Sequence, residues 1–96
     1  MRGFETAARL LMLVGELDDW TAAAPCHELA CVAQGAVRPQ IEGYALAYHG
    51  FDSSAPARLR KDVPNGVHTG QGVHVGGEPL ARATARERLL RFLAEQ

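Results

Sequence analysis

The stretch FETAARLLMLVGEL, residues 4–17, is the longest nearly unbroken apolar run of the chain, and the rest of the sequence reads as cover for it. Most of its residues favour a helix, and Glu5 with Arg9 makes an i,i+4 pair with the acid on the amino-terminal side. In a helix its leucines and Val14 fill two neighbouring lines, so the apolar stripe needs cover on more than one side. The sequence therefore predicts a central core helix over residues 4–17.

A second copy of the chain could supply part of that cover. The residues that such an interface would use are the large apolar side chains of the predicted helix and the tryptophan that follows it. They are Leu10, Leu13, Val14, Leu17 and Trp20. Trp20 also suits an amphipathic lid at the edge of the core.

Composition limits the class of protein. The chain has 96 residues, 47% of them hydrophobic, and a formal net charge of −1. These values predict one globular domain over residues 1–96, and no overall field that would attract nucleic acid or anionic membrane. No apolar run is long enough to span a bilayer, and no export signal is expected. Cys26 and Cys31 are too few for a disulfide framework, which indicates reduced thiols and a cytoplasmic location.

The middle of the chain predicts a second helix, a strand and a long loop. Residues 21–34 suit a helix with Pro25 in its first turn and Gly35 after its end, although residues 29–32 would also suit a strand. Residues 37–48 turn to β-forming side chains after Pro39. Residues 49–66 read as a loop with Phe51 packed inwards and a tight turn at residues 65–66. A loop of this length is mobile or functional, or it conceals another element.

Two further patterns complete the chain. The stretch VHTGQGVHV, residues 67–75, is nearly palindromic around its glycines and predicts a hairpin in which His68 faces His74 and Val67 faces Val75. Residues 78–96 predict a helix with Pro79 in its first turn and two i,i+4 pairs, Glu87 with Arg91 and Arg91 with Glu95. Its expected inner face is Ala81, Ala85, Leu89, Phe92 and Leu93, and its expected outer face carries Arg82, Arg86, Arg88 and Arg91.

The expected fold class is therefore α+β. Two or three helices pack on one face of a small antiparallel sheet, in the order α-(α)-β-β-β-α. The second helix is in parentheses because residues 21–34 could be helix or strand.

A metal site is one hypothesis for function. His27 and Cys31 are spaced i,i+4 on the second predicted helix, and His68 and His74 share one face of the predicted hairpin. One thiolate and three imidazoles are ligand types compatible with tetrahedral zinc. The chain has no Cys-x2-Cys or His-Glu-x-x-His spacing, so a buried cysteine and exposed histidines are the simpler interpretation.

Nucleophilic catalysis is a second hypothesis. Cys26 or Cys31 could act with a histidine, among them His27 and His49, and with Asp52 or Asp62 as the orienting acid. These residue types occur without diagnostic spacing, and the sequence has no nucleophile elbow, phosphate-binding loop or dinucleotide fingerprint. An enzyme is therefore the less favoured class.

Nucleic-acid binding is a third hypothesis. The basic residues that would serve it are Arg82 and Arg86 on the last helix with Arg58, Arg60 and Lys61 in the preceding loop. The order helix, strands, helix is similar to that of the double-stranded RNA-binding domain, and this resemblance implies that the start of the last helix contacts phosphates. Glu78 and Pro79 stand where that family has a lysine pair, and the helix over residues 21–34 is additional to the family.

The favoured function is a small non-catalytic interaction or regulatory module that associates with itself through apolar helix surface. Its partners would be a second copy or another protein, and no cofactor is expected unless the four His and Cys residues bind zinc. The reason is that the apolar surface exceeds what a small sheet can cover, while no group of residues has catalytic spacing.

Overall fold

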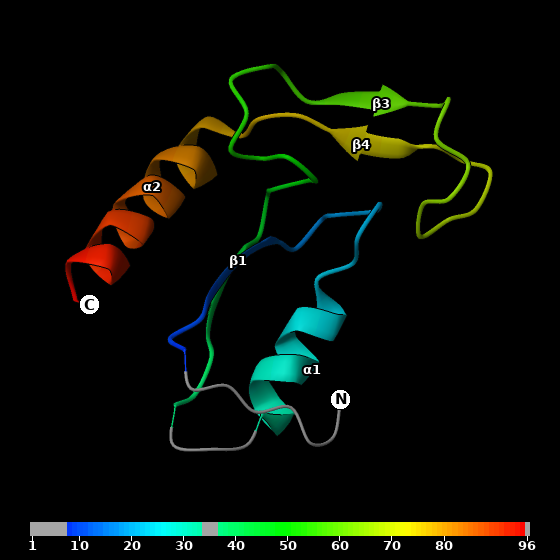
Figure 1. Cartoon of the computed structure of the whole chain (residues 1–96). Coiled ribbons are helices and arrows are strands. Elements are labelled where there is room, and N and C mark those ends of the chain that lie inside the picture. Colours follow the sequence, from blue (N-terminus) through cyan, green and yellow to red (C-terminus); the bar gives the residue numbers. More distant parts are fainter. Residues whose placement is uncertain (1–7, 34–36, 96) are drawn as a thin grey trace.

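The computed structural model describes residues 8–33 and 37–95. The first four residues of the predicted first helix, and Gln34 and Gly35 at the end of the predicted second helix, lie outside the described residues. The described residues form two helices and two strand pairs, in the order β1, α1, β2, β3, β4, α2. Figure 1 labels all of these elements except β2.

The apolar run forms a strand. Strand β1, Leu11–Gly15, pairs in parallel with β2, Gln40–Tyr44, in a register that places Met12 beside Ile41. The prediction of a helix through residues 8–17 is therefore wrong. A strand covered on both faces carries apolar side chains without alternation, so its sequence resembles the face of a buried helix.

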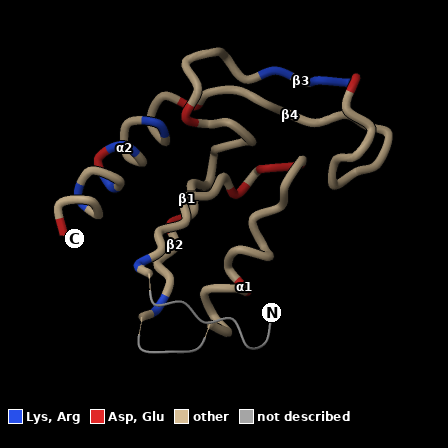
Figure 2. The backbone as a smooth tube through the Cα atoms, in the orientation of Figure 1, with Lys and Arg blue, Asp and Glu red and all other residues tan. Residues whose placement is uncertain are grey.

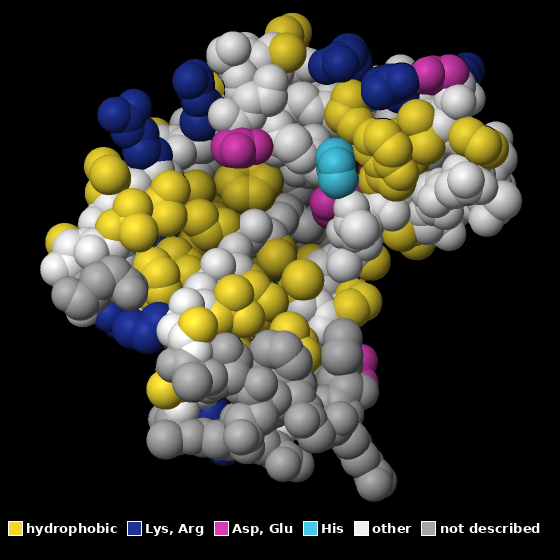
Figure 3. All heavy atoms as spheres, viewed as in Figure 1, with side chains coloured by type: hydrophobic (Ala, Val, Ile, Leu, Met, Phe, Trp, Pro, Cys, Tyr) yellow, Lys and Arg dark blue, Asp and Glu magenta, His cyan; other side chains and the backbone are white. Residues whose placement is uncertain are grey.

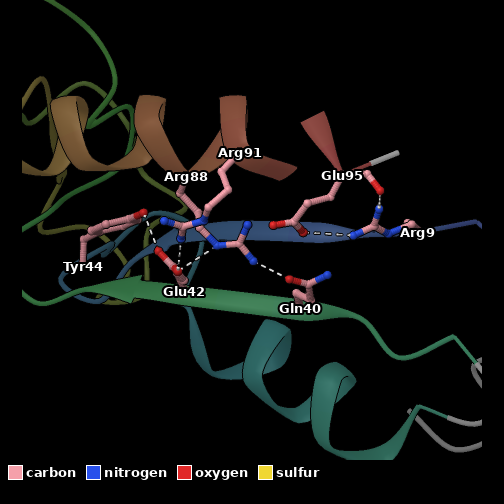
Figure 4. Close-up of polar contacts among 7 residues, drawn as sticks. All are labelled: Arg9, Gln40, Glu42, Tyr44, Arg88, Arg91 and Glu95. Atoms are coloured by element: carbon pink, nitrogen blue, oxygen red, sulfur yellow. Dashed lines mark hydrogen bonds and ion pairs between the residues drawn. The ribbon is translucent and has the colours of Figure 1, made fainter. Parts of the chain in front are cut away.

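The two helices cover opposite faces of this strand pair. Helix α1, Ala24–Val32, connects the strands and packs on β2, while α2, Pro79–Ala94, packs on β1 (Figures 1 and 4). Side chains alternate along a strand, so Leu13 points towards α2 and Glu16 towards α1. The chain thus forms a parallel β-α-β unit, β1-α1-β2, with α2 as a third layer.

The predicted fold class is corrected accordingly. The described residues form two helices and four strands, in one parallel and one antiparallel two-stranded sheet. A single antiparallel sheet with every helix on one face is wrong, and so is the predicted element order. The resemblance to the double-stranded RNA-binding domain fails with it, because that resemblance depended on an amino-terminal helix.

The second sheet replaces the predicted hairpin. Strand β3, Arg58–Arg60, pairs antiparallel with β4, Val73–Val75, and Leu59 rather than His68 lies opposite His74. Strand β3 lies within the predicted loop over residues 49–66. Gly70 and Gly72, with φ of 82° and 78°, are in the loop that joins the strands. The turn there is closed from Gln71 N to His68 O at 3.0 Å, and residues 65–66 form no hydrogen-bonded turn.

The core consists of two small clusters. One lies between α2, β1 and the segment after β2, and comprises Ala47, Phe51, Ala81 and Ala85, with Leu13 and Tyr44 packed against it. The other lies beneath the second sheet and comprises Val63, Val73 and Val75, with Trp20 against it. The burial predicted for Phe51 is confirmed, and Trp20 is half-buried at a core edge as expected.

The two helices were predicted in the right places. Helix α2 begins with Pro79, and the Glu78 carboxylate caps it by accepting hydrogen bonds from Ala81 N at 2.6 Å and Leu80 N at 3.3 Å. Two details of its prediction are wrong. Arg88 is buried rather than on the outer face, while Leu89 and Leu93 are exposed rather than on the inner face. No helix in the described residues has the length and hydrophobicity to cross a membrane.

Candidate functional site

A cleft of about 520 Å³ lies between the two helices and beside β1. Helix α1 and the turn before it form one wall, α2 forms the other, and β1 with the segment after β2 closes the cleft. Figure 3 shows hydrophobic side chains over α2 and over the neighbouring part of the chain. The lining residues are mainly apolar, and they include Leu13, Val14, Ala23, Phe51, Ala85 and Leu89.

Two arginines stand on the α2 wall of this cleft. Arg82 and Arg86 also line a second hollow of about 610 Å³, whose other residues include Ser53 and Ser54. Within the described part of the chain, neither guanidinium forms an ion pair, whereas Arg60, Arg88 and Arg91 each pair with a carboxylate. The two cations at the cleft are therefore available to an external anion.

The segment over residues 16–19, directly after β1, pairs with three histidines (its acidic residues are red in Figure 2). Its three acids come from one turn, and their partners come from α1, from the segment after β2 and from β4. The pairs are Glu16 Oε1 with His27 Nε2 at 2.6 Å, Asp18 Oδ2 with His49 Nδ1 at 3.1 Å, and Asp19 Oδ2 with His74 Nδ1 at 2.6 Å. This acidic turn thus connects the two sheets.

Asp19 bonds to both the backbone and the ring of its histidine. Its carboxylate accepts hydrogen bonds from the backbone N–H of His74 at 2.8 Å and from the ring at 2.6 Å. Burial raises the pKa of Asp19, but the two hydrogen bonds and the charge of His74 outweigh burial and hold this pKa below its ordinary value of 3.8. The His74 ring stacks on Tyr48 with ring centroids 4.7 Å apart. The pairing fixes β4 against the turn after β1.

The residues predicted to bind zinc are not assembled. His27 and His74 belong to different acid–histidine pairs, while His68 and Cys31 are exposed. The described residues contain no group of three or more His, Cys, Asp or Glu side chains that could hold a metal ion. The structure therefore offers no common site for His27, Cys31, His68 and His74.

The candidates for nucleophilic catalysis form no hydrogen-bonded cysteine–histidine pair among the described residues, although Cys26 and Asp52 both line the cleft. Both cysteines are unbridged; Cys26 is half-buried in the wall of the cleft, and Cys31 is exposed. Asp62 pairs with Arg60 at 2.6 Å and not with a histidine, and this hydrogen bond lowers the pKa of Asp62. His49 and Asp18 do form a pair, with the Thr21 hydroxyl 2.9 Å from His49 Nδ1.

The residues predicted to bind nucleic acid lie on two elements. Arg82 and Arg86 are on α2, Arg58 and Arg60 are on β3, and Lys61 follows β3. Basic side chains occur over both elements along one edge of the face in Figure 3. Arg60 is neutralised by Asp62, which leaves fewer free cations on β3 than the sequence implies.

The predicted interface residues lie around β1. Leu10, Leu13 and Val14 are half-buried, and Leu13 and Val14 line the cleft. Leu17 is 42% exposed, and Trp20 packs on the second core cluster. Leu13 and Val14 therefore share the cleft, whereas Trp20 belongs to the second core cluster, and the five side chains do not form one helix face.

Sequence reasoning missed the buried network at Arg88 (Figure 4). Arg88 Nε donates to Glu42 Oε1 at 2.8 Å, and its Nη2 donates to Gln40. Glu42 also accepts a hydrogen bond from the Tyr44 hydroxyl at 3.0 Å. Burial, together with this contact, raises the pKa of Tyr44 to about 12. The alternation of polar side chains at positions 40, 42 and 44 could have indicated this network, because alternate residues of a strand place three polar groups on one sheet face.

Searches of protein-family models, curated proteins and solved structures found no match to this chain.

Proposed function

We propose that this chain is a non-catalytic interaction module and that its first partner is a second copy of itself. The observation that carries the proposal is the exposure of its leucines. No leucine in the described residues is buried, although leucine is among the residue types most often found in cores.

The exposed leucines concentrate at the end of α2. Leu89, Leu90 and Leu93 are 43%, 55% and 54% exposed. Leu93 follows Leu90 by three residues and Leu89 by four, so it lies beside both on the helix surface. We call these three residues the leucine patch. A contiguous apolar patch on a protein surface is typical of an interaction site.

Two properties favour a second copy as the occupant of the patch. Two copies related by a two-fold axis use the same patch twice, so no other complementary surface is needed. The charges around the patch have both signs, Arg86 and Arg91 against Glu87 and Glu95, and the net charge of the chain is only −1. Electrostatic repulsion between two copies is therefore small.

Sedimentation velocity over a range of micromolar concentrations tests this proposal. The unaltered chain is expected to be a dimer, and the double variant Leu90→Glu with Leu93→Glu is expected to be a monomer with an unchanged circular dichroism spectrum. Leu80→Glu is the matched control, because Leu80 is 71% exposed on the same helix but lies outside the patch. A monomeric unaltered chain at every concentration would exclude self-association.

We also propose a reducing compartment, such as the cytoplasm, as the location of this module. The free thiols of Cys26 and Cys31 support it, since oxidising compartments favour disulfides. Thiol alkylation inside intact cells followed by mass spectrometry tests it. Both cysteines should be labelled without prior reduction, and finding them already oxidised would contradict the proposal.

A further inference from the structure

One edge of β1 is open in the described residues. Leu10 O accepts a hydrogen bond from Gln40 N at 2.9 Å, and Glu16 N donates to Tyr44 O at 3.0 Å. Backbone groups alternate in direction along a strand, so Met12 and Val14 also face β2, while the N–H and C=O groups of Leu11 and Leu13 point away from it. No described backbone group pairs with these four groups. An open edge of this kind can pair with another strand.

The cleft lies along the carboxyl-terminal half of this open edge, and Leu11 continues the edge beyond the cleft. Leu13, Val14 and Gly15 line it, with α1 on one side and α2 on the other. An extended chain placed there would direct alternate side chains towards the two helices. Ala23 on one side and Ala85 on the other are small, which leaves room for apolar side chains of the added strand.

The charge of the cleft indicates what else the added strand carries. Arg82 and Arg86 line the cleft without an ion-pair partner among the described residues. Two carboxylates line it as well, but Asp18 is bonded to His49 and to the N–H groups of Trp20 and Thr21. Asp52 alone opposes the two arginines, so a further carboxylate is favoured there.

The two arginines lie near the carboxyl end of β1. Helix α2 runs opposite to β1, since Arg9, which precedes the strand, pairs with Glu95 at the end of the helix. Arg82 and Arg86 belong to the first half of α2 and therefore lie towards Gly15. The carboxylate of an added strand would have to lie at this end.

We propose that the cleft binds an extended peptide that adds to the open edge of β1. The peptide has apolar side chains and carries a carboxylate beside Arg82 and Arg86. Backbone hydrogen bonds to Leu11 and Leu13 hold the peptide, while the pockets and the arginines select its sequence. This partner is different from a second copy at the leucine patch, with which the cleft shares only Leu89.

Fluorescence anisotropy with short synthetic peptides tests the proposal. The probes are fluorescein-labelled peptides of valine, leucine and threonine that end in two glutamates, in an amidated and in a free-acid form. A second set ends in two lysines. A third set has the acidic sequence with N-methyl groups at alternate residues, which removes the N–H donors that strand addition requires. The two forms of the acidic probe distinguish a side-chain carboxylate from a terminal one.

The charges of the cleft determine which effects we expect from substitutions. Arg82→Glu with Arg86→Glu should weaken binding of the acidic probe about tenfold or more and improve binding of the lysine probe. The matched control is Arg58→Glu with Lys61→Glu, because it makes the same charge change on exposed residues in β3 and directly after it. Both positions are exposed on α2, so the fold should persist.

The binding results either support or overturn strand addition. Binding of the acidic probe that is lost on N-methylation and on the α2 charge reversal, but kept in the control, supports strand addition. Equal binding of the N-methylated probe, equal binding of the acidic and lysine probes, or no binding of any probe would overturn it. The variant Leu90→Glu with Leu93→Glu should bind the acidic probe normally, so a failure of self-association and a failure of peptide binding are distinguishable.

Discussion

The parallel pair β1–β2 lies between two helices, whereas the antiparallel pair β3–β4 has the rings of Trp20 and Tyr48 and an acidic turn as its main contacts. The first pair is supported on one face by a buried arginine network and by a cluster of three alanines and Phe51. The second is supported by three valines and by the Asp19–His74 pair. The comparison shows that β1, which is covered on two faces, can carry a continuous apolar run. The pair β3–β4 at the side of the molecule depends instead on local contacts to stay in place.

The largest expected effect is at the buried arginine of the parallel layer. Arg88→Ala leaves Glu42 and Gln40 without their partner. Loss of one member of a buried ion pair costs about 3–5 kcal/mol, and because Glu42 keeps some contact with water we expect about 2–3 kcal/mol. Urea unfolding followed by far-ultraviolet circular dichroism measures it.

Arg91→Ala is the matched control for this change. Arg91 is 63% exposed and lies 4.0 Å from the same Glu42 carboxylate, so its removal should cost less than about 0.5 kcal/mol. Equal losses in the two variants would mean that burial of Arg88 contributes nothing to stability.

The second effect concerns the antiparallel pair. Among the described residues, Val73 is the largest side chain that is fully buried, so Val73→Ala should destabilise the protein by about 2 kcal/mol. Trp20, the only tryptophan, packs on the same cluster, so its fluorescence reports this region. If the two regions unfold separately, Val73→Ala should lower the urea midpoint of the transition followed by fluorescence. The midpoint followed by circular dichroism should stay unchanged.

Val67→Ala serves as its control, since Val67 is 50% exposed. A shift of the same size in Val67→Ala would contradict the packing described for Val73. Coincident transitions by both probes would show instead that the two regions unfold as one unit.

The third effect is at the close approach between β1 and the segment after β2. A methyl group on Gly15 would lie 2.5 Å from Ala47 O and 2.9 Å from Tyr48 O, which are backbone atoms that cannot move independently. Gly15→Ala should therefore cost about 1–3 kcal/mol. Thermal unfolding measures it. Gly50→Ala is the contrast: no atom lies within 4 Å of the added methyl group, so any loss of stability there reports only the positive φ of 71° and not a steric clash. A Gly15→Ala variant as stable as the unaltered chain would exclude this packing.

The smallest effect concerns the pair that ties the two sheets together. Asp19→Asn should cost about 1 kcal/mol near neutral pH, because a charge-assisted hydrogen bond is replaced by a neutral one. The folded pKa of Asp19 is lowered, so the stabilisation is present above the ordinary value of 3.8 and is lost as the pH falls through the folded value.

Unfolding free energies measured from neutral to acid pH check this effect. The difference between the unaltered chain and Asp19→Asn should shrink as the pH falls from the ordinary aspartate value of 3.8 through the folded pKa of Asp19. A difference that stays the same or grows over this acid range would contradict the assigned direction of the pKa shift.

The helices and β2 could be predicted from the sequence because their signals are local. Pro25, Pro79 and the composition after Pro39 mark element starts that the structure confirms. Strand β1 could not be predicted in the same way, since its cover comes from α1 and α2 elsewhere in the chain. Strand β3, Arg58–Arg60, has too few residues and too much charge to be recognised, and its pairing with Val73–Val75 depends on contacts distant in sequence.

The cleft itself was not predicted from the sequence, although four of its lining residues were named for other roles. Leu13, Val14 and the pair Arg82 and Arg86 were named from the sequence, for two different hypotheses, and the structure places all four on one cleft. The acid–histidine pairs and the buried Arg88 were missed because charged residues were assigned to the solvent. The position of acidic residues directly after a buried parallel strand is the signal that could have located them, because polar groups often gather at the carboxyl ends of such strands.

Amide hydrogen exchange along β1, measured by NMR on dilute protein without peptide, tests the structure most directly. A strand paired on one edge predicts alternation, with slow exchange at Met12, Val14 and Glu16 and fast exchange at Leu11 and Leu13. Slow exchange at every residue from 11 to 15 would contradict it, because only a helix or a strand paired on both edges protects consecutive amides in that way.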